Sequence, residues 1–353
     1  MTDEIKVPQV TARRRLRLAV VGTGLGSAPH FASLRDLAGE AEIAWVVSRS
    51  ATGLARAPVP PQTKRTTRLQ EALDDPGLDA VLVLTPPASH HEVGCLAAAA
   101  GKHVLVEKPL GIDALRAMQL VHACERAGVR LGVMLQHRLR EGPLALADLV
   151  QSGRLGAFVG GSASVRWWRP QAYYDEPGRG TLARDGGGVL LTQAIHTLDL
   201  LLHVTGMPVR VTGSVSTSPI HRMECEDTAT ALLHYPSGAV AVLRATTAAH
   251  PGFPERIELD FTRGSATLVA GELQACLQDG TQARAGAAQG GGGADPMDFG
   301  HTSHRAVLQD FMHAVRSGVE PQVTGRSALG VQQVIEAVIR SSREGRAVEL
   351  AGG

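Results

Sequence analysis

Short apolar segments alternate with amphipathic segments over the first part of the chain, up to residue 138. The apolar runs are typical of buried strands and cover Leu16–Val21, Glu42–Val47, Asp79–Thr85, Val104–Glu107 and Val129–Leu135. Helical periodicity predicts helices between them over Phe31–Leu37, Thr66–Leu73, His91–Ala100 and Ile112–Ala127, the last ended by Gly128. This alternation predicts a doubly wound parallel sheet in which Val129–Leu135 is the last strand.

The pattern changes after Leu139 to longer segments in which apolar and polar residues alternate. These segments predict strands over Ala157–Trp168, Val209–Ser218, Asp227–Tyr235, Ala239–Ala248, Glu255–Thr262 and Ser265–Val269. Tight turns at 236–238 and 262–264 indicate hairpins, and hence an antiparallel sheet. One leucine-rich helix is predicted over Gly188–Val204, two more over His304–Ser317 and Gly325–Glu344, and a glycine-rich mobile loop over 284–300. We therefore expect a loose tail (1–15), a dinucleotide-binding domain (16–138) and a second α/β domain (139–353).

Composition limits the class of protein. The chain has 353 residues, 44% of them hydrophobic, and a formal net charge of +1, which suits two globular domains and argues against nucleic acid or an anionic membrane as the main partner. No apolar run reaches the length of a membrane span. The basic segment 13–17 resembles a twin-arginine export signal, but its apolar run is short and enters a glycine turn. We expect a cytoplasmic protein.

Cysteine and histidine spacing gives no sign of a metal site. The four cysteines fit a reducing compartment and form neither a disulfide framework nor a zinc motif; they are Cys95, Cys124, Cys225 and Cys276. The histidines at 90, 91, 196, 203 and 234 show no usual ligand spacing. No metal is expected.

A glycine-rich turn follows the first strand. Gly22, Gly24, Leu25 and Gly26 form this turn, with Ser27 in place of the third glycine of the usual dinucleotide-binding pattern. Glycines let a phosphate approach the backbone, and the helix that follows offers free N–H groups to a pyrophosphate. The turn is weak evidence alone, but a strand before it and a helix after it strengthen the interpretation.

The second strand ends in Ser48, Arg49 and Ser50, about 20 residues after the glycines. In dinucleotide-binding folds, residues at this position contact the adenosine ribose. An acidic residue there would accept from the 2′-hydroxyl group and repel a 2′-phosphate, and none is present. Two hydroxyl groups and a guanidinium favour NADP over NAD, with NAD still possible. The alternative is that Arg49 is an ordinary exposed arginine.

Polar residues gather at the predicted carboxyl edge of the sheet, where ligands bind in such folds. The segment Gly101–Gly111 is a buried strand that ends in Glu107, Lys108 and Pro109. The other strand ends contribute Thr85, Pro86, His90 and Gln136 to the same edge. The alternative is that Glu107 and Lys108 form a solvated surface pair.

A second group of candidate residues lies on the leucine-rich helix. Thr192 and His196 are four residues apart, so one continuous helix would place them on the same face. Three glycines, 186–188, precede them and permit close approach of a ligand. The alternative is that His196 is a hydrogen-bonded core residue.

Together these motifs resemble the Gfo/Idh/MocA family of NAD(P)-dependent oxidoreductases. The resemblance covers nearly the whole chain and rests on the glycine turn, Thr85-Pro86 with His90, Glu107-Lys108-Pro109, and the glycine-led helix with its histidine. It implies a Rossmann domain followed by an α/β domain whose open, mainly antiparallel sheet mediates homo-oligomers, dimers or tetramers. It also implies that Lys108 and His196 are catalytic, that Glu107 lies near the nicotinamide, and that the Lys108–Pro109 bond is cis.

Thr192 departs from the family pattern, because many relatives carry an aspartate four residues before the histidine. A carboxylate would orient the imidazole and stabilise its charged form, whereas threonine adds no charge. We therefore expect Lys108 to be the main acid/base group, its pKa lowered by burial beside the nicotinamide, with His196 and Thr192 as partners. Asp199 could replace the aspartate, although a structural role fits it better.

The segment 166–179 suggests the substrate. It contributes Arg169, Tyr173, Tyr174 and Arg179, and we expect these, with Thr192 and His196, to bind a cyclic polyol, sugar, uronic acid or carboxylated dihydrodiol. A subunit interface would favour the same residue types. Two other functions use the same scaffold: an NAD-dependent glycoside hydrolase, and a ligand-sensing regulator, against which Lys108 and His196 argue.

Overall fold

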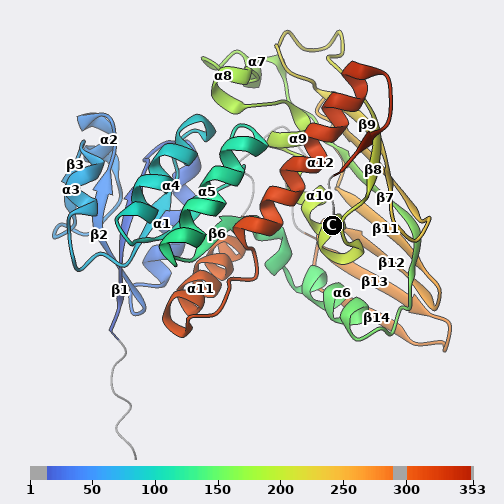
Figure 1. Cartoon of the computed structure of the whole chain (residues 1–353), viewed down its shortest axis with the longest axis horizontal. Coiled ribbons are helices and arrows are strands. Elements are labelled where there is room, and N and C mark those ends of the chain that lie inside the picture. The colour runs from blue at the N-terminus through green and yellow to red at the C-terminus, as the bar shows by residue number, and fades with distance from the viewer. Residues whose placement is uncertain (1–13, 289–299, 351–353) are drawn as a thin grey trace, which may run out of the picture.

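The computed structural model describes residues 14–288 and 300–350 and is shown in Figure 1. Its first domain contains a six-stranded parallel sheet in the order β3-β2-β1-β4-β5-β6. The strands are β1 (Leu16–Val21), β2 (Ala41–Val47), β3 (Lys64–Thr66), β4 (Ala80–Val83), β5 (His103–Glu107) and β6 (Leu131–Met134). The helices between them are η1 (Leu25–Ser27), α1 (Ala28–Asp36), α2 (Ala51–Arg56), α3 (Leu69–Leu73), η2 (Pro87–Ser89), α4 (His90–Ala99) and α5 (Ala114–Ala127).

Helices cover both faces of this sheet, which explains why its strands are apolar without alternation. On β1, Leu18 and Val20 pack with α1 and with α11 (Thr302–Ser317), whereas Ala19 and Val21 face the core that contains α4 and α5. The strand order changes direction between β1 and β4. The carboxyl ends of the strands at that point are where such sheets bind ligands.

The second domain is built on a nine-stranded sheet in the order β14-β13-β12-β11-β7-β10-β9-β8-β15. All neighbouring pairs are antiparallel except β7 with β10. Its strands are β7 (Phe158–Arg166), β8 (Arg210–Ser216), β9 (Thr228–His234), β10 (Val240–Thr246), β11 (Arg256–Phe261), β12 (Gly264–Val269), β13 (Glu272–Leu277), β14 (Gln282–Ala285) and β15 (Val348–Glu349). The helical segments are η3 (Gln136–Leu139), α6 (Glu141–Gln151), α7 (Gln171–Tyr174), α8 (Leu182–Asp185), α9 (Val189–Thr192), α10 (Ile195–Thr205) and α12 (Gly325–Glu344).

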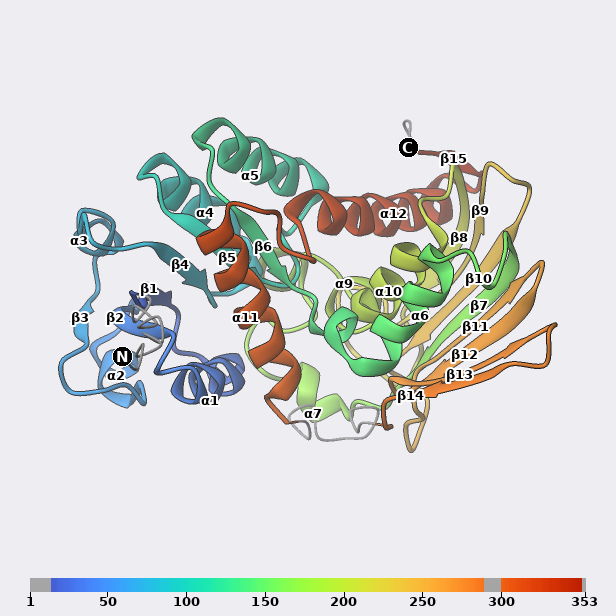
Figure 2. The same cartoon turned by 90° about the horizontal axis from the view of Figure 1, so that it is seen from below.

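Helices α6, α10 and α12 cover one face of the second sheet, and the opposite face carries no helix of the described residues (Figures 1 and 2). Strands β8 to β12 accordingly alternate between buried and more exposed residues. Leu232 and Val242, paired across β9 and β10, lie on the uncovered face and are each 40% exposed.

The end of the chain returns to the first domain. Phe311 and Met312 of α11 are buried against its sheet, and the Val133 amide donates to the Val323 carbonyl oxygen at 3.1 Å. Helix α12 then passes back to β8 (Figure 2). The predicted division at residue 138 separates the two sheets, but it places this returning segment with the second domain only.

The fold class predicted from the pattern is confirmed, including both hairpins and the Gly128 cap, whose φ is 67°. The helix predicted over Thr66–Leu73 begins at Leu69, because the residues before it form the edge strand β3. The predicted loop over 284–300 begins inside β14, and residues 289–299 lie outside the described residues, as do residues 1–13 of the predicted tail. Helices α2 and α6 and strands β13 to β15 were not predicted.

The single helix predicted over Gly188–Val204 is wrong. It is broken at Gln193 and Ala194 into α9 and α10. The amides of both residues donate to the Val189 carbonyl oxygen, at 3.1 and 2.8 Å. The bond from Ala194 therefore spans five residues in place of the four of an α-helix. The Thr192 hydroxyl also donates to the Gly188 carbonyl oxygen at 2.7 Å, a bond that bends helices. Apolar residues on both sides hide this break in the sequence.

No single helix among the described residues is long and apolar enough to cross a membrane. The segments Leu182–Thr192 and Ile195–Thr205 reach that length and composition only as a pair bent by 53°.

Candidate active site

One cavity of about 1400 Å³ extends from the glycine turn of the first domain to the helical segments α7 to α10 of the second. It brings together most of the residues that the sequence nominated from distant segments. The nominated residues that line it are Gly22, Gly24, Gly26, Ser48, Arg49, Ser50, Thr85, Pro86, Glu107, Lys108, Gln136, Arg169, Tyr173, Arg179, Thr192 and His196.

Two nominated residues do not line this cavity. His90 is buried, and its Nδ1 and Nε2 lie 2.8 Å from the Pro109 and 2.7 Å from the Thr85 carbonyl oxygens. It therefore connects the two turns behind the cavity and leaves no ring nitrogen for a ligand. Tyr174 is also buried, with its hydroxyl 2.7 Å from the Thr247 hydroxyl. The side chain of Leu25 lies outside the described residues.

The glycine turn has the shape that a pyrophosphate requires. Gly22 has a φ of +107°, and a Cβ atom there would lie 2.7 Å from the Leu84 carbonyl group. Gly24 and Gly26 have no atom within 4 Å of the place where a Cβ would stand. The side chain of Ser27 makes no cap hydrogen bond to α1 and donates to the Gly24 carbonyl oxygen at 2.6 Å. The turn therefore leaves open space for a dinucleotide, and the residues present fit that cofactor.

Hydroxyl groups and arginines gather where the cavity passes the end of β2 and the helix α2. The Thr23 hydroxyl donates to the Ser48 hydroxyl at 3.1 Å, and Ser50 caps α2 by accepting from the Gly53 amide at 3.0 Å. Arg49 is exposed at the cavity rim, and Arg56 of α2 lies at the same rim. Arg56 was not predicted, because nothing in the sequence indicated that α2 would turn its last residue to this site.

Lys108 lines the cavity where the first domain meets α9. Its Nζ donates to the Thr192 carbonyl oxygen at 2.8 Å, and the peptide bond to Pro109 is cis. Burial lowers the pKa of Lys108 below its ordinary 10.5, opposed by the negative charges of Glu107 and Asp185. A lysine with a lowered pKa can exchange a proton near neutral pH.

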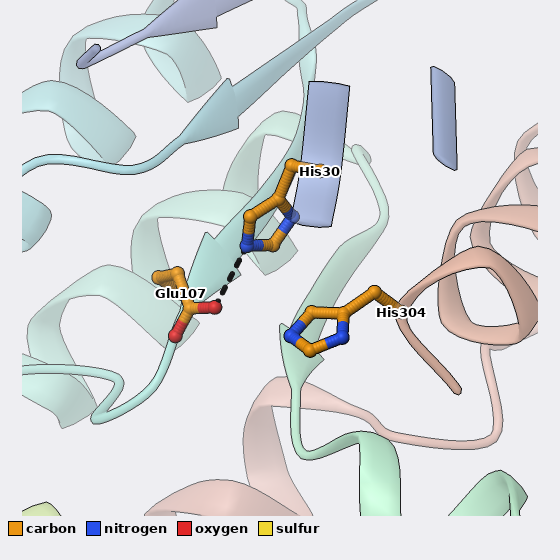
Figure 3. A group of neighbouring side chains, drawn as sticks. All are labelled: His30, Glu107 and His304. Carbon is orange, nitrogen blue, oxygen red and sulfur yellow. Dashed lines mark hydrogen bonds and ion pairs between the residues drawn. The ribbon is translucent and has the colours of Figure 1, made fainter. Parts of the chain in front are cut away.

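Glu107 belongs to a buried group with His30 and His304, shown in Figure 3. Its Oε1 lies 2.9 Å from the His30 Nε2, and the ligand-type atoms of the three residues lie within 4.8 Å of one another. Burial alone would raise the pKa of Glu107, but the hydrogen bond and positive charge of His30 lower it to about 2. Spacing could not reveal this group, because its members come from α1, β5 and α11.

His196 faces the cavity from the first turn of α10, without the expected help of Thr192. The helix break separates the two side chains, and the Thr192 hydroxyl bonds to Gly188 and Gln193 instead. Burial, and then the positive charge of Lys108, keep the pKa of His196 well below 6.5. Asp199 is fully buried in a two-bond ion pair with Arg138, so it holds that arginine and not His196.

The candidate substrate loop presents alternate residues to the cavity. Trp167 and Arg169 line it, with the Arg169 guanidinium 5.3 Å from the Trp167 ring centroid. Tyr173 lies beside them, its hydroxyl accepting from Arg179 at 2.9 Å. By contrast Arg166 stacks on Phe253, outside the residues that line the cavity.

Several cavity residues were missed by the sequence analysis. His137 lies in η3, the short helix after β6, and Arg140 follows that helix, so the strand end was a usable signal, of which only Gln136 was taken. Gln193 enters the cavity only because the helix breaks there. Glu255 lies just before β11, and no local pattern marked it.

Comparisons with known proteins agree with this geometry. A family described as "Oxidoreductase family, NAD-binding Rossmann fold" matches residues 16–135, and the "GFO/IDH/MocA C-terminal domain" matches residues 144–267. A D-apiose dehydrogenase of Paraburkholderia graminis is 30% identical over 99% of this chain and 94% of its own length.

Two further relatives bear on the ligands. The WlbA dehydrogenase of Bordetella pertussis, solved in complex with NADH and UDP-GlcNAcA, is 26% identical with a TM-score of 0.82, over 96% of this chain and all of that one. A scyllo-inositol 2-dehydrogenase (NADP⁺) of Bacillus subtilis is 28% identical over 57% of this chain and 54% of its own. The chain therefore belongs to the Gfo/Idh/MocA family and is an NAD(P)-dependent oxidoreductase that acts on alcohol groups.

Proposed function

We propose that this enzyme transfers a hydride between NADP and a secondary alcohol or ketone of a cyclic polyol, sugar, uronic acid or carboxylated dihydrodiol. The observation that supports this most is the single cavity, in which the amine of Lys108 and the imidazole of His196 share walls with the glycine turn. A proton-transfer group from each domain thus borders the space that a nicotinamide ring and a small substrate would occupy.

Lys108 is the group that takes up the hydroxyl proton in the oxidation direction. The bound cofactor supplies the hydride acceptor, and the protein handles the proton. A neutral Lys108 amine can keep one N–H on the Thr192 carbonyl oxygen and turn its lone pair towards the substrate hydroxyl. In the reverse direction the protonated amine returns the proton to the carbonyl oxygen. His196, held neutral, acts as a hydrogen-bond partner of the same oxygen.

The substrate class rests on the cavity residues of the segment 166–179. Arg169 and Arg179 bring guanidinium groups that suit a carboxylate, and Tyr173, with the Arg179 guanidinium 4.3 Å from its ring centroid, adds an aromatic side chain that suits a sugar ring. The relatives support the same class, since one is named for a sugar and another holds a nucleotide sugar with an acid group.

The preference for NADP rests on the ribose end of the cavity. Arg49 and Arg56 offer two positive charges to a 2′-phosphate, and the segment 48–50 contains no carboxylate to repel it. The named NADP⁺-dependent relative supports this assignment.

We also propose that the enzyme forms homo-oligomers in the cytoplasm through the uncovered face of the second sheet. Leu232 and Val242 supply exposed apolar surface on that face. All four cysteines are free, as a reducing compartment requires. Size-exclusion chromatography with light scattering tests the oligomer, and Leu232→Glu with Val242→Glu should shift it towards the monomer.

A screen of sugars, polyols, uronic acids and carboxylated dihydrodiols with NADP and with NAD tests the function. We expect reduced nicotinamide to accumulate with at least one ring-shaped alcohol, faster with NADP. Cleavage of a glycoside without net cofactor reduction would instead identify a hydrolase. Binding of ligands without any turnover would identify a sensor and overturn the proposal.

A further inference from the structure

The part of the chain that the structure describes gives the His196 ring no hydrogen bond at its buried Nδ1 to fix its orientation. The Thr192 hydroxyl donates to the Gly188 carbonyl oxygen, and the Asp199 carboxylate is paired with Arg138, so neither side chain orients His196. An imidazole without an orienting bond can rotate, and rotation would misdirect its Nε2.

A second imidazole lies flat against His196. The ring of His137 stacks on it with centroids 4.4 Å apart and planes 20° from parallel. Both side chains are 6% exposed, and both line the cavity beside Lys108. A flat ring in this position limits the side-chain rotation of its neighbour, because interiors are close-packed.

His137 is itself fixed from the second sheet. Arg140 Nη2 donates to His137 Nε2 at 2.8 Å, and Arg140 Nη1 lies 3.4 Å from the Oε1 of Glu255, the residue just before β11. An arginine can only donate, so His137 Nε2 must accept and the ring proton must sit on Nδ1. Arg140 and Glu255 are both largely buried. The chain of contacts from Glu255 through Arg140 therefore sets both the plane and the tautomer of His137.

We infer that His137 is a positioning residue that orients His196 by stacking, in place of the carboxylate that this chain lacks. The inference rests on the proposed function of the same cavity. The burial and the charges around His196 favour the neutral form of both stacked imidazole rings. Burial and the charges of Lys108, Arg140 and His304 lower the pKa of His196, Glu107 opposes them, and burial also holds the pKa of His137 well below 6.5.

A double-mutant cycle tests the inference with the full-length enzyme. His137→Ala should lower kcat about tenfold to a hundredfold, since small misplacements of catalytic groups cost that much, while the KM for cofactor stays the same. His137→Phe keeps a flat ring and should restore most of the rate. In a His196→Ala background, His137→Ala should change kcat by less than about twofold, because the two residues act as one unit. His203→Ala, an exposed histidine of α10, is the matched control and should be silent.

Equal losses from His137→Ala in both backgrounds would overturn the inference, as would failure of His137→Phe to restore the rate. A readout independent of turnover separates this from failure of the proposed function. Imidazole ¹⁵N spectra of histidine-labelled enzyme should show neutral His137 protonated on Nδ1. The ring-current shift of the His196 protons should disappear in His137→Ala and persist in His137→Phe. A His196 spectrum unchanged by His137→Ala would overturn the inference whatever the substrate is.

Discussion

Replacing Lys108 by methionine removes the amine while keeping the length and apolar stem of the side chain. The charge of this amine is costly where it lies, since burial lowers its pKa. The variant is therefore expected to fold at least as stably as the parent, because the cost of burying a charged group disappears. What it loses is the proton acceptor beside the Thr192 carbonyl oxygen.

The magnitude of the loss follows from that role. A positioned general acid or base contributes about 10²–10⁴-fold to rate, which corresponds to roughly 2.7–5.5 kcal/mol of barrier. We expect kcat and kcat/KM to fall together by this factor, because the proton moves only in the transition state. Cofactor affinity should hardly change.

The pH dependence gives a second, signed expectation. Only the neutral amine accepts a proton, so alcohol oxidation should accelerate as pH rises through the pKa of Lys108, with a midpoint below 10.5. Ketone reduction should slow over the same range. Glu107 raises the pKa of Lys108, so Glu107→Gln should move the midpoint to lower pH.

Initial rates measured by reduced-nicotinamide absorbance across pH, with cofactor binding followed by fluorescence, are the assay. Lys64→Ala, a lysine exposed on the edge strand β3, is the matched control. Near-normal turnover of Lys108→Met, or an unchanged pH midpoint in Glu107→Gln, would refute the reasoning.

Three further predictions address the cofactor, stability and metal. Arg49→Ala should raise the KM for NADP far more than that for NAD, and equal increases would refute the 2′-phosphate assignment. Asp199→Asn leaves the Arg138 charge buried without its carboxylate partner, so urea unfolding should show a loss of about 3–5 kcal/mol; a loss below about 1 kcal/mol would contradict the importance of that pair. Prolonged EDTA treatment should leave activity unchanged, because the Glu107 carboxylate is already bonded to His30; activity restored only by added metal would identify a metal centre instead.

The fold was largely predictable because burial on two faces and burial on one face leave different patterns. Apolar strands such as Val104–Glu107 and alternating strands such as Thr228–His234 reveal which sheet they belong to. Residues at strand ends, such as Lys108, could be nominated because parallel strands share one carboxyl edge. In these cases the local sequence was enough to predict the structure.

The remaining features depend on contacts between distant segments. The break at Gln193 arises from backbone geometry between two apolar runs, 189–191 and 194–195, that fit one helix equally well. The stack of His137 on His196 joins η3 to α10, and the burial of His90 depends on two carbonyl groups from separate turns. Periodicity and motif spacing do not predict such contacts. The end of β6 marked His137 as a residue near the site, but it could not predict the stack on His196 or the burial of His90.

Helix α11 has a consequence for the order in which the protein can mature. Phe311 and Met312 complete the apolar covering of the first sheet, yet they are synthesised after strands β7 to β14 of the second sheet. During translation the face of the first sheet that α11 covers stays exposed to solvent until residue 317 emerges. The nascent first domain therefore presents an apolar surface that chaperones or neighbouring chains can bind. A fragment that stops at residue 138 should therefore precipitate unless a peptide spanning 302–317 is supplied.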